Sequence, residues 1–245
     1  MPPKEDIAVC VFGLLVVFGI ACFLAYGWYL HVYKPGLAAG RVLSDLTSAL
    51  REAGSAWVQT SEVSLQRHWN PLDATGDRGA PFVQGTWQGN LAVIRFQIEL
   101  GRPETPFRGG AEPGRREYRP PTTAIVLISK QRLAKRAGLK RSTKADLFAN
   151  KAFVALGMSP QLRPVSEGLF AYGEEDTEIA RFFNPSVLAL VRSFPRDLFG
   201  PSFEGPVIEG SEIRMSWEGH ETDPKVIEAA FRLLKTISDA GAAER

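Results

Sequence analysis

Histidine, cysteine and paired acidic residues are the side chains best suited to transfer protons or bind metal ions, and this chain has few of them. Its three histidines, His31, His68 and His220, are scattered along the 245 residues. No two stand at the i, i+4 spacing that would place both imidazoles on one helix face. Both cysteines, Cys10 and Cys22, lie in one apolar run. The sequence therefore predicts no catalytic residue, no metal ligand and no cofactor.

Three consecutive acids, Glu174, Glu175 and Asp176, are the strongest candidates for acid–base chemistry, because paired carboxylates hydrolyse glycosidic bonds. They also precede an apolar periodic segment, where acidic side chains cap a helix and favour its dipole. We interpret them as capping residues. A hydrolytic site assembled from dispersed Ser, His and acidic residues stays open as an alternative, although no G-x-S-x-G motif marks a nucleophile.

The most unusual feature of the polar part is the basic stretch KQRLAKRAGLKRSTK, residues 130–144. No acid lies between Glu117 and Asp146. Three interpretations stay open: a solvated helix-and-turn face, a surface for anionic lipid headgroups, or a docking surface for an acidic partner or a second copy. Nucleic acid is not expected as a partner, because no aromatic residues are interleaved with the charges. The predicted interaction patch consists of Lys130, Arg132, Lys135, Arg136, Lys140, Arg141 and Lys144.

Ile7–Leu30 is an apolar run of 24 residues without a charge, and it is the candidate membrane anchor of the chain. As a helix it would be about 36 Å long, enough to cross a hydrocarbon core of about 30 Å. An export signal would be shorter and follow a more basic tail, and a lipid-attachment site at Cys22 would be followed by polar residues. The sequence therefore predicts a single uncleaved transmembrane anchor within residues 1–36.

Residues within and beside this anchor indicate its contacts and its orientation. Ala21 and Ala25 are small and four residues apart, so another membrane helix could approach closely there. Lys34-Pro35-Gly36 predicts a helix break. We expect the run to lie in the cytoplasmic membrane. Its two flanks differ by a margin of one basic residue, and this margin favours the C-terminal domain on the cytoplasmic side. The residues predicted to lie at the membrane interface are Tyr26, Trp28, Tyr29 and Tyr33.

Residues 37–245 are predicted to form one α+β domain with a mainly antiparallel sheet and flanking helices, interrupted by a flexible loop over residues 101–121. Helices are expected over about 37–54, 143–156, 176–183, 185–194 and 224 onwards, from apolar residues at helical spacing. Strands are expected over 57–65, in a hairpin over 81–100 that turns at Gln88-Gly89-Asn90, at 122–129 and 168–173, and in a second hairpin over 206–219. No glycine fingerprint of a dinucleotide-binding fold is present.

The charge is unevenly distributed. Residues 101–144 contain twelve Lys or Arg and three acids, whereas residues 167–228 contain thirteen acids and five bases. The W-x-G turn, the segment GLFAYGEED and the segment ARFFNPSVLALV resemble stretches of uncharacterised single-pass bacterial proteins, and this resemblance implies no activity. We predict a non-catalytic accessory subunit that binds the lipid bilayer and other membrane protein subunits or a second copy. The alternatives are a tethered hydrolase and a module that binds anionic lipid.

Overall fold

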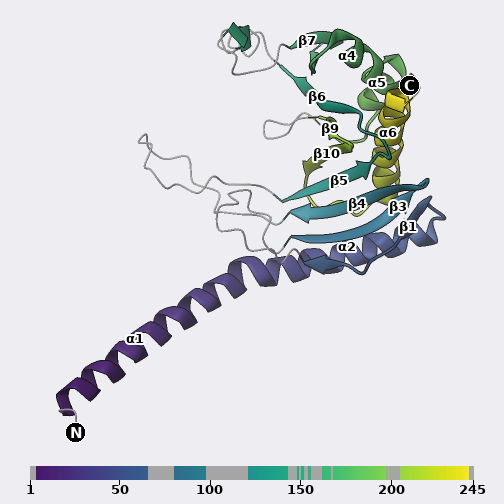
Figure 1. Ribbon diagram of the computed structural model, residues 1–245. Helices are drawn as coiled ribbons and strands as arrows, with labels where there is room; N and C mark the ends of the chain where they lie inside the picture. The colour runs from purple at the N-terminus through teal and green to yellow at the C-terminus, as the bar shows by residue number, and fades with distance from the viewer. Residues whose placement is uncertain are drawn as a thin grey trace.

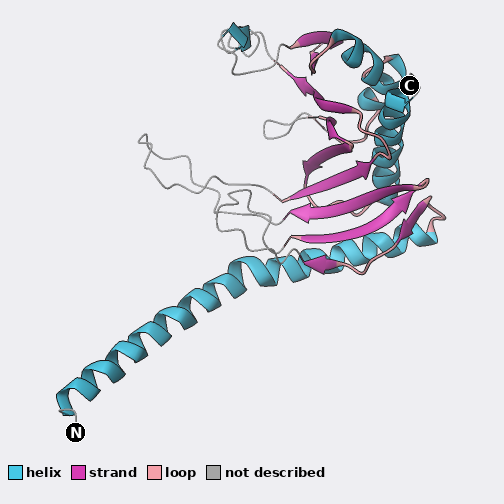
Figure 2. Cartoon of the chain, viewed as in Figure 1, coloured by secondary structure: helices cyan, strands magenta, loops and turns pink. Residues whose placement is uncertain are grey.

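The computed structural model describes residues 4–65, 80–97, 121–142, 148, 150–151, 154–155, 162–166, 168–196, 198 and 205–242, without the side chains of residues 4–12 and 31–32. In this part of the chain a ten-stranded sheet has the order β1-β3-β4-β5-β10-β9-β6-β8-β7, with β2 also paired to β3. All of its described pairings are antiparallel. The prediction of an α+β domain with a mainly antiparallel sheet and flanking helices is confirmed (Figures 1 and 2).

The strands are β1 (Trp57–Gln59), β2 (Ser64–Leu65), β3 (Pro81–Trp87), β4 (Asn90–Gln97), β5 (Thr122–Ile128), β6 (Ala134–Arg141), β7 (Arg163–Ser166), β8 (Leu169–Tyr172), β9 (Val207–Gly210) and β10 (Glu212–Glu218). The helical segments are α1 (Lys4–Trp28), η1 (Tyr29–Tyr33), α2 (Lys34–Glu52), α4 (Asp176–Phe182), α5 (Pro185–Arg192) and α6 (Pro224–Ala242).

The core lies between one face of the sheet and the helices α2 and α6. Helix α2 contacts β1 to β4, and α6 contacts β5, β10, α4 and α5. At one end of this core the ring of Phe231 stacks on Trp57 and Trp87, with ring centroids 5.4 and 5.0 Å away. Trp57 and Trp87 are cross-strand partners in β1 and β3. Gly85 lies beneath them, because a Cβ there would come within 2.5 Å of the Trp57 ring.

The N-terminal helix does not break at Lys34-Pro35-Gly36, so that prediction is wrong. Helix α1 continues through the π-helical turn η1 into α2, as Figure 1 shows. A proline inside a regular helix lacks one N–H and clashes with the carbonyl four residues earlier. Here the Lys34 N–H bonds to the Tyr29 carbonyl, five residues back. The wider π turn makes room for Pro35, and the helix continues.

Within the part of the chain that the structure describes, no helix is both long enough and apolar enough to cross a membrane. The predicted span Ile7–Leu30 includes residues 7–12, whose side chains lie outside that part.

Some predicted elements differ from the observed ones. The strand expected over 57–65 is divided into β1 and β2, and strand β6 was not predicted. The helix expected over 143–156 falls mostly on residues outside the described part of the chain. The flexible loop predicted over 101–121 also lies outside it, except for Pro121. Both predicted hairpins are present, and the first turns through Gln88 and Gly89, whose φ angles are 46° and 78°.

Candidate functional site

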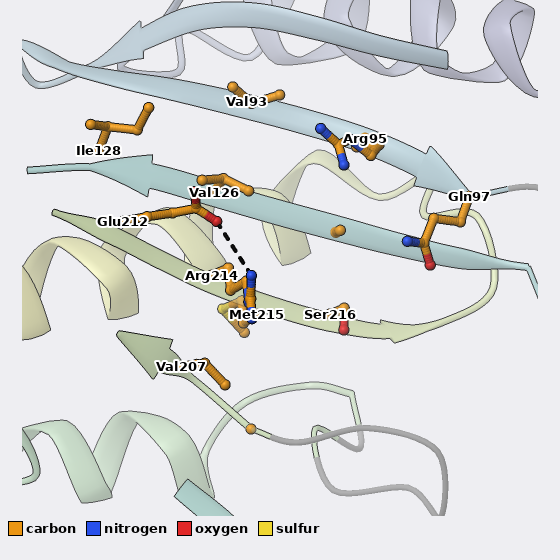
Figure 3. A pocket seen from close by; sticks show the side chains of 12 residues that line it. Val93, Arg95, Gln97, Val126, Ile128, Val207, Glu212, Arg214, Met215 and Ser216 are labelled. Atoms are coloured by element: carbon orange, nitrogen blue, oxygen red, sulfur yellow. Dashed lines mark ion pairs between the residues drawn. The ribbon is translucent and has the colours of Figure 1, made fainter. Parts of the chain in front are cut away.

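The face of the sheet that α2 and α6 do not cover has a hollow of about 500 Å³ across β4, β5, β10 and β9 (Figure 3). Successive side chains of a strand point to opposite faces of the sheet, so each strand contributes every second side chain to the hollow. In β4, Ala92, Ile94 and Phe96 are buried in the core, so the residues between them face the other way. The side chains that point into the hollow from this face are Val93, Arg95, Gln97, Ala124, Val126, Ile128, Val207, Glu212, Arg214 and Ser216.

Strand pairing sets the order of these side chains. Ile128 lies opposite Glu212, and Val126 lies opposite Arg214. One step further along β5, Ala124 lies opposite both Arg95 on β4 and Ser216 on β10. The central strand β5 therefore supplies a floor of small and apolar side chains, while the charged side chains come from the strands on either side of it.

The charges of the hollow are mixed in sign. The Arg214 guanidinium lies 3.4 Å from the Glu209 carboxylate and 3.8 Å from that of Glu212. At the other end, Thr122 Oγ1 donates a hydrogen bond of 2.7 Å to Gln97 Oε1. Among the described residues that line the hollow there is no histidine or cysteine. This combination of apolar side chains and paired charges can bind an amphipathic group.

Behind the hollow, on the helix side of the sheet, Glu221 is the centre of a buried polar cluster. Its side chain is 2% exposed, and it accepts hydrogen bonds from Arg196 Nε (2.9 Å) and Nη2 (3.2 Å). Trp217 Nε1 donates a third bond of 3.2 Å. The backbone N–H groups of Thr222 and Asp223 donate two more, each 3.0 Å long. Glu221 therefore fixes the segment that leads into α6.

The environment of Glu221 makes the stability of the protein depend on pH. Burial of the carboxylate raises the pKa of Glu221, but the hydrogen bonds and charge of Arg196 and the bonds from the Asp223 and Thr222 N–H groups outweigh it. The net effect holds the pKa of Glu221 below its ordinary value. The carboxylate therefore contributes stability that is fully present above the ordinary glutamate pKa of about 4.3 and is lost as the pH falls through the lower folded-state pKa.

We expect the stability advantage of the native protein over the Glu221→Gln variant to be constant near neutral pH and to shrink in acid. Urea unfolding midpoints of both proteins, measured between about pH 7 and about pH 3, would test this. Glu218→Gln, at an exposed position of β10, is the control and should change the free energy of unfolding near neutral pH by less than about 0.5 kcal/mol. An advantage at Glu221 that grew towards low pH would contradict the assigned shift.

His220 does not belong to the hollow. Its ring stacks on Phe96 at a centroid distance of 4.8 Å, and its Nε2 lies 2.8 Å from the Gln97 carbonyl oxygen. The neighbouring hydroxyl of Thr123 donates to the Gly219 carbonyl and accepts a bond from the Glu221 N–H. His68 lies outside the described residues, and so does the side chain of His31. The hydrolase alternative stays an untested prediction.

The basic stretch forms strand β6 and the turn before it, between β9 and β8, rather than a helix-and-turn face. Because alternate residues of a strand face opposite sides, its charges are divided between the two faces of the sheet. Lys135 forms an ion pair of 3.0 Å with Glu174, so part of its charge is compensated within the chain. The exposed members are Lys130, Arg132, Lys135, Arg136 and Arg141; Lys140 is half-buried, and Lys144 lies outside the described residues.

The three acids do start a helix, but none of them makes the expected capping bond. Glu175 is the N-cap residue of α4 and its side chain accepts no backbone hydrogen bond. Glu174 pairs with Lys135, and Asp176 pairs with Arg163. Glu175 instead accepts a hydrogen bond of 3.3 Å from the Thr177 hydroxyl. Charge pairing between elements therefore takes the place of side-chain capping.

The predicted interface residues gather where α1 joins η1. Trp28 stacks on Tyr33 with centroids 5.4 Å apart, and Tyr29 lies 6.0 Å from the same ring. Tyr26, Trp28 and Tyr29 are exposed, and so are Ala21 and Ala25. Their role at a membrane stays a prediction. Over the described residues, no three His, Cys, Asp or Glu side chains are grouped closely enough to hold a metal ion.

No protein-family model and no curated protein sequence matches the chain. Among solved structures, the chain is similar to the crystal structure of the mycobacterial trehalose monomycolate transport factor A, TtfA, at 13% sequence identity and a TM-score of 0.47. The match covers 82% of this chain and 93% of that one. A similarity of this size assigns neither a function nor a partner.

Proposed function

We propose that this protein is a single-pass, membrane-anchored accessory subunit that binds other proteins and is not itself an enzyme. Helix α1 is the anchor, and the body lies on the cytoplasmic side of the membrane. The observation that carries this proposal is an exposed apolar helix joined without interruption to the domain core. Leu14, Phe18 and Phe23 on α1 are 71%, 68% and 76% exposed.

Two properties of this helix support an anchor over a soluble arm. Large contiguous apolar surfaces on isolated proteins mark sites that contact a membrane or another protein. In addition, the sequence from Ile7 to Leu30 contains no charge, so no polar stripe would remain for water. Helix α2, by contrast, is amphipathic and buries Leu43, Leu46 and Leu50 in the core. The chain therefore changes from uniformly apolar to amphipathic across η1.

The hollow supports a binding role for the body. Its floor is apolar, its rim carries charges of both signs, and its volume is about 500 Å³. A protein surface is a suitable occupant, because apolar contact and paired charges are the two components of protein interfaces.

We expect Leu15→Arg combined with Phe18→Arg to move the protein from carbonate-washed membranes to the soluble fraction. Each arginine near the middle of a membrane helix costs about 3 kcal/mol of insertion free energy. Pelleting followed by immunoblotting measures the distribution. The matched control, Leu37→Arg with Val58→Arg, places the same charges at exposed apolar positions of α2 and β1 and should stay with the membrane. Retention of the first variant would exclude α1 as the anchor.

A further inference from the structure

Helix α1 projects away from the sheet (Figure 1), so the core does not fix its rotation about its own axis. Every residue from 13 to 26 is exposed, whereas α2 buries Leu43, Leu46 and Leu50 in the core. These contacts hold α2 at one rotation relative to the sheet. The rotation of α1 relative to the body is therefore set by η1, the turn that joins the two helices.

The turn η1 takes up one residue more than an α-helical turn. Its hydrogen bond from the Lys34 N–H to the Tyr29 carbonyl spans five residues instead of four. In an α-helix each residue advances the rotation by about 100° and the length by about 1.5 Å. The extra residue therefore turns α1 by about 100° from the position that an uninterrupted α-helix would give it.

An aromatic stack across η1 depends on the same extra residue. Trp28 and Tyr33 are five residues apart, and their rings stack with centroids 5.4 Å apart and planes inclined by 28°. In an α-helix, side chains five residues apart point about 140° away from each other. The wider π turn brings them to one side of the helix. The contact between Tyr29 and Tyr33 spans four residues and is compatible with either kind of turn.

Pro35 is the residue that excludes an α-helical turn at this place. In a regular helix its ring would clash with the carbonyl four residues earlier, which belongs to His31. Alanine at the same position would meet no such clash. Because π turns are rare compared with α-helical turns, an alanine there should allow the helix to become α-helical throughout. One proline thus accounts for the extra residue in the turn.

We propose that η1 sets the rotational register of α1 relative to the body, with Pro35 keeping one extra residue in the helix and the Trp28–Tyr33 stack packing across it. The consequence of this register rests on the proposed function. With α1 as the anchor, η1 determines which side of the anchor faces the membrane subunits that the body binds. The register itself is measurable in detergent, independently of any membrane.

Distances between spin labels in the detergent-purified full-length protein, measured by pulsed electron paramagnetic resonance, test the proposal. Cys10 and Cys22 are replaced by alanine, and one labelled cysteine replaces Arg232, which is exposed on α6. The second label is placed in turn at each of residues 15 to 18, which are exposed and follow one another around α1. A rotation of α1 by about 100° moves such a label by up to about 8 Å.

We expect Pro35→Ala to shift the series of four distances by one position. The label at residue 16 should then give the distance that residue 15 gives in the native protein, and so on along the series. Leu37→Ala, at an exposed position two residues further along α2, is the matched control and should leave all four distances unchanged. Pro35→Gln should reproduce the shift and serves as a second variant in case Pro35→Ala fails to fold.

Deletion of one residue makes the test specific to rotation. Removing Leu30 from the Pro35→Ala protein takes out the extra residue, so the native series of distances should return. Three outcomes overturn the proposal: an unchanged series in the Pro35→Ala protein, a changed series that the deletion does not restore, and native distances too broad to define one rotation.

Pelleting of native membranes reports separately on the anchor. A protein that pellets with the membrane and gives one of these three outcomes refutes the register alone. A native protein that is soluble and gives the expected series refutes the proposed function alone.

Discussion

Replacing Phe231 by alanine should lower the free energy of unfolding by about 3–5 kcal/mol, the usual cost of removing a buried aromatic ring. The ring is fully buried and stacks on Trp57 and Trp87, so the substitution removes contacts with β1, β3 and the rest of the core together. Pairing of β1 with β3 holds the two tryptophans in place, so their rings can fill the resulting cavity only in part. Urea unfolding followed by tryptophan fluorescence measures the loss directly.

The matched control for Phe231 is Phe148→Ala, because Phe148 is 80% exposed. Its removal should change the free energy of unfolding by less than about 0.5 kcal/mol. The Phe231→Ala protein should also have an altered emission spectrum in the folded state, since its two neighbouring indoles gain space. A loss below about 1 kcal/mol would mean that α6 does not hold this end of the core.

The elements with a strong apolar period were predictable from the sequence. In α6, Ile227, Ala230, Phe231, Leu234 and Ile237 follow the helical spacing, and the core buries all five. Both hairpins were predictable for the same reason, because a period of two residues assigns each side chain to one face of a strand. The same period places Arg95 and Gln97 on the opposite face of β4 from Phe96.

The hollow itself could not be predicted, because the sequence does not show which strands are neighbours. Arg95 and Arg214 are far apart in the chain, and only the order β4-β5-β10 brings them to one surface. Strand β6 was missed for a related reason. Its sequence AKRAGLKR has few apolar residues and two of them are alanines, so burial between β9 and β8 overrides a weak local preference.

The continuity of α1 and α2 was missed because a proline followed by a glycine normally ends a helix. The π turn that accommodates Pro35 depends on a hydrogen bond from Lys34 to Tyr29, which no local propensity encodes. This continuity has a structural consequence, because a helix without a flexible joint fixes the direction in which the body leaves α1.

Replacing Glu221 by alanine should destabilise the protein by about 1–3 kcal/mol, because it leaves buried N–H donors without an acceptor, whereas water can solvate the half-exposed Arg196. Arg196, Trp217 and two backbone N–H groups just before α6 would all lose their acceptor. Urea unfolding near neutral pH measures the effect, and Glu218→Ala on the exposed side of β10 is the control, with an expected change below about 0.5 kcal/mol. Arg196→Met should recover little of the loss in the double variant, because the backbone and indole donors would still lack an acceptor. A fully additive pair of single-variant effects would show that Glu221 and Arg196 are not energetically coupled and would refute the cluster as described.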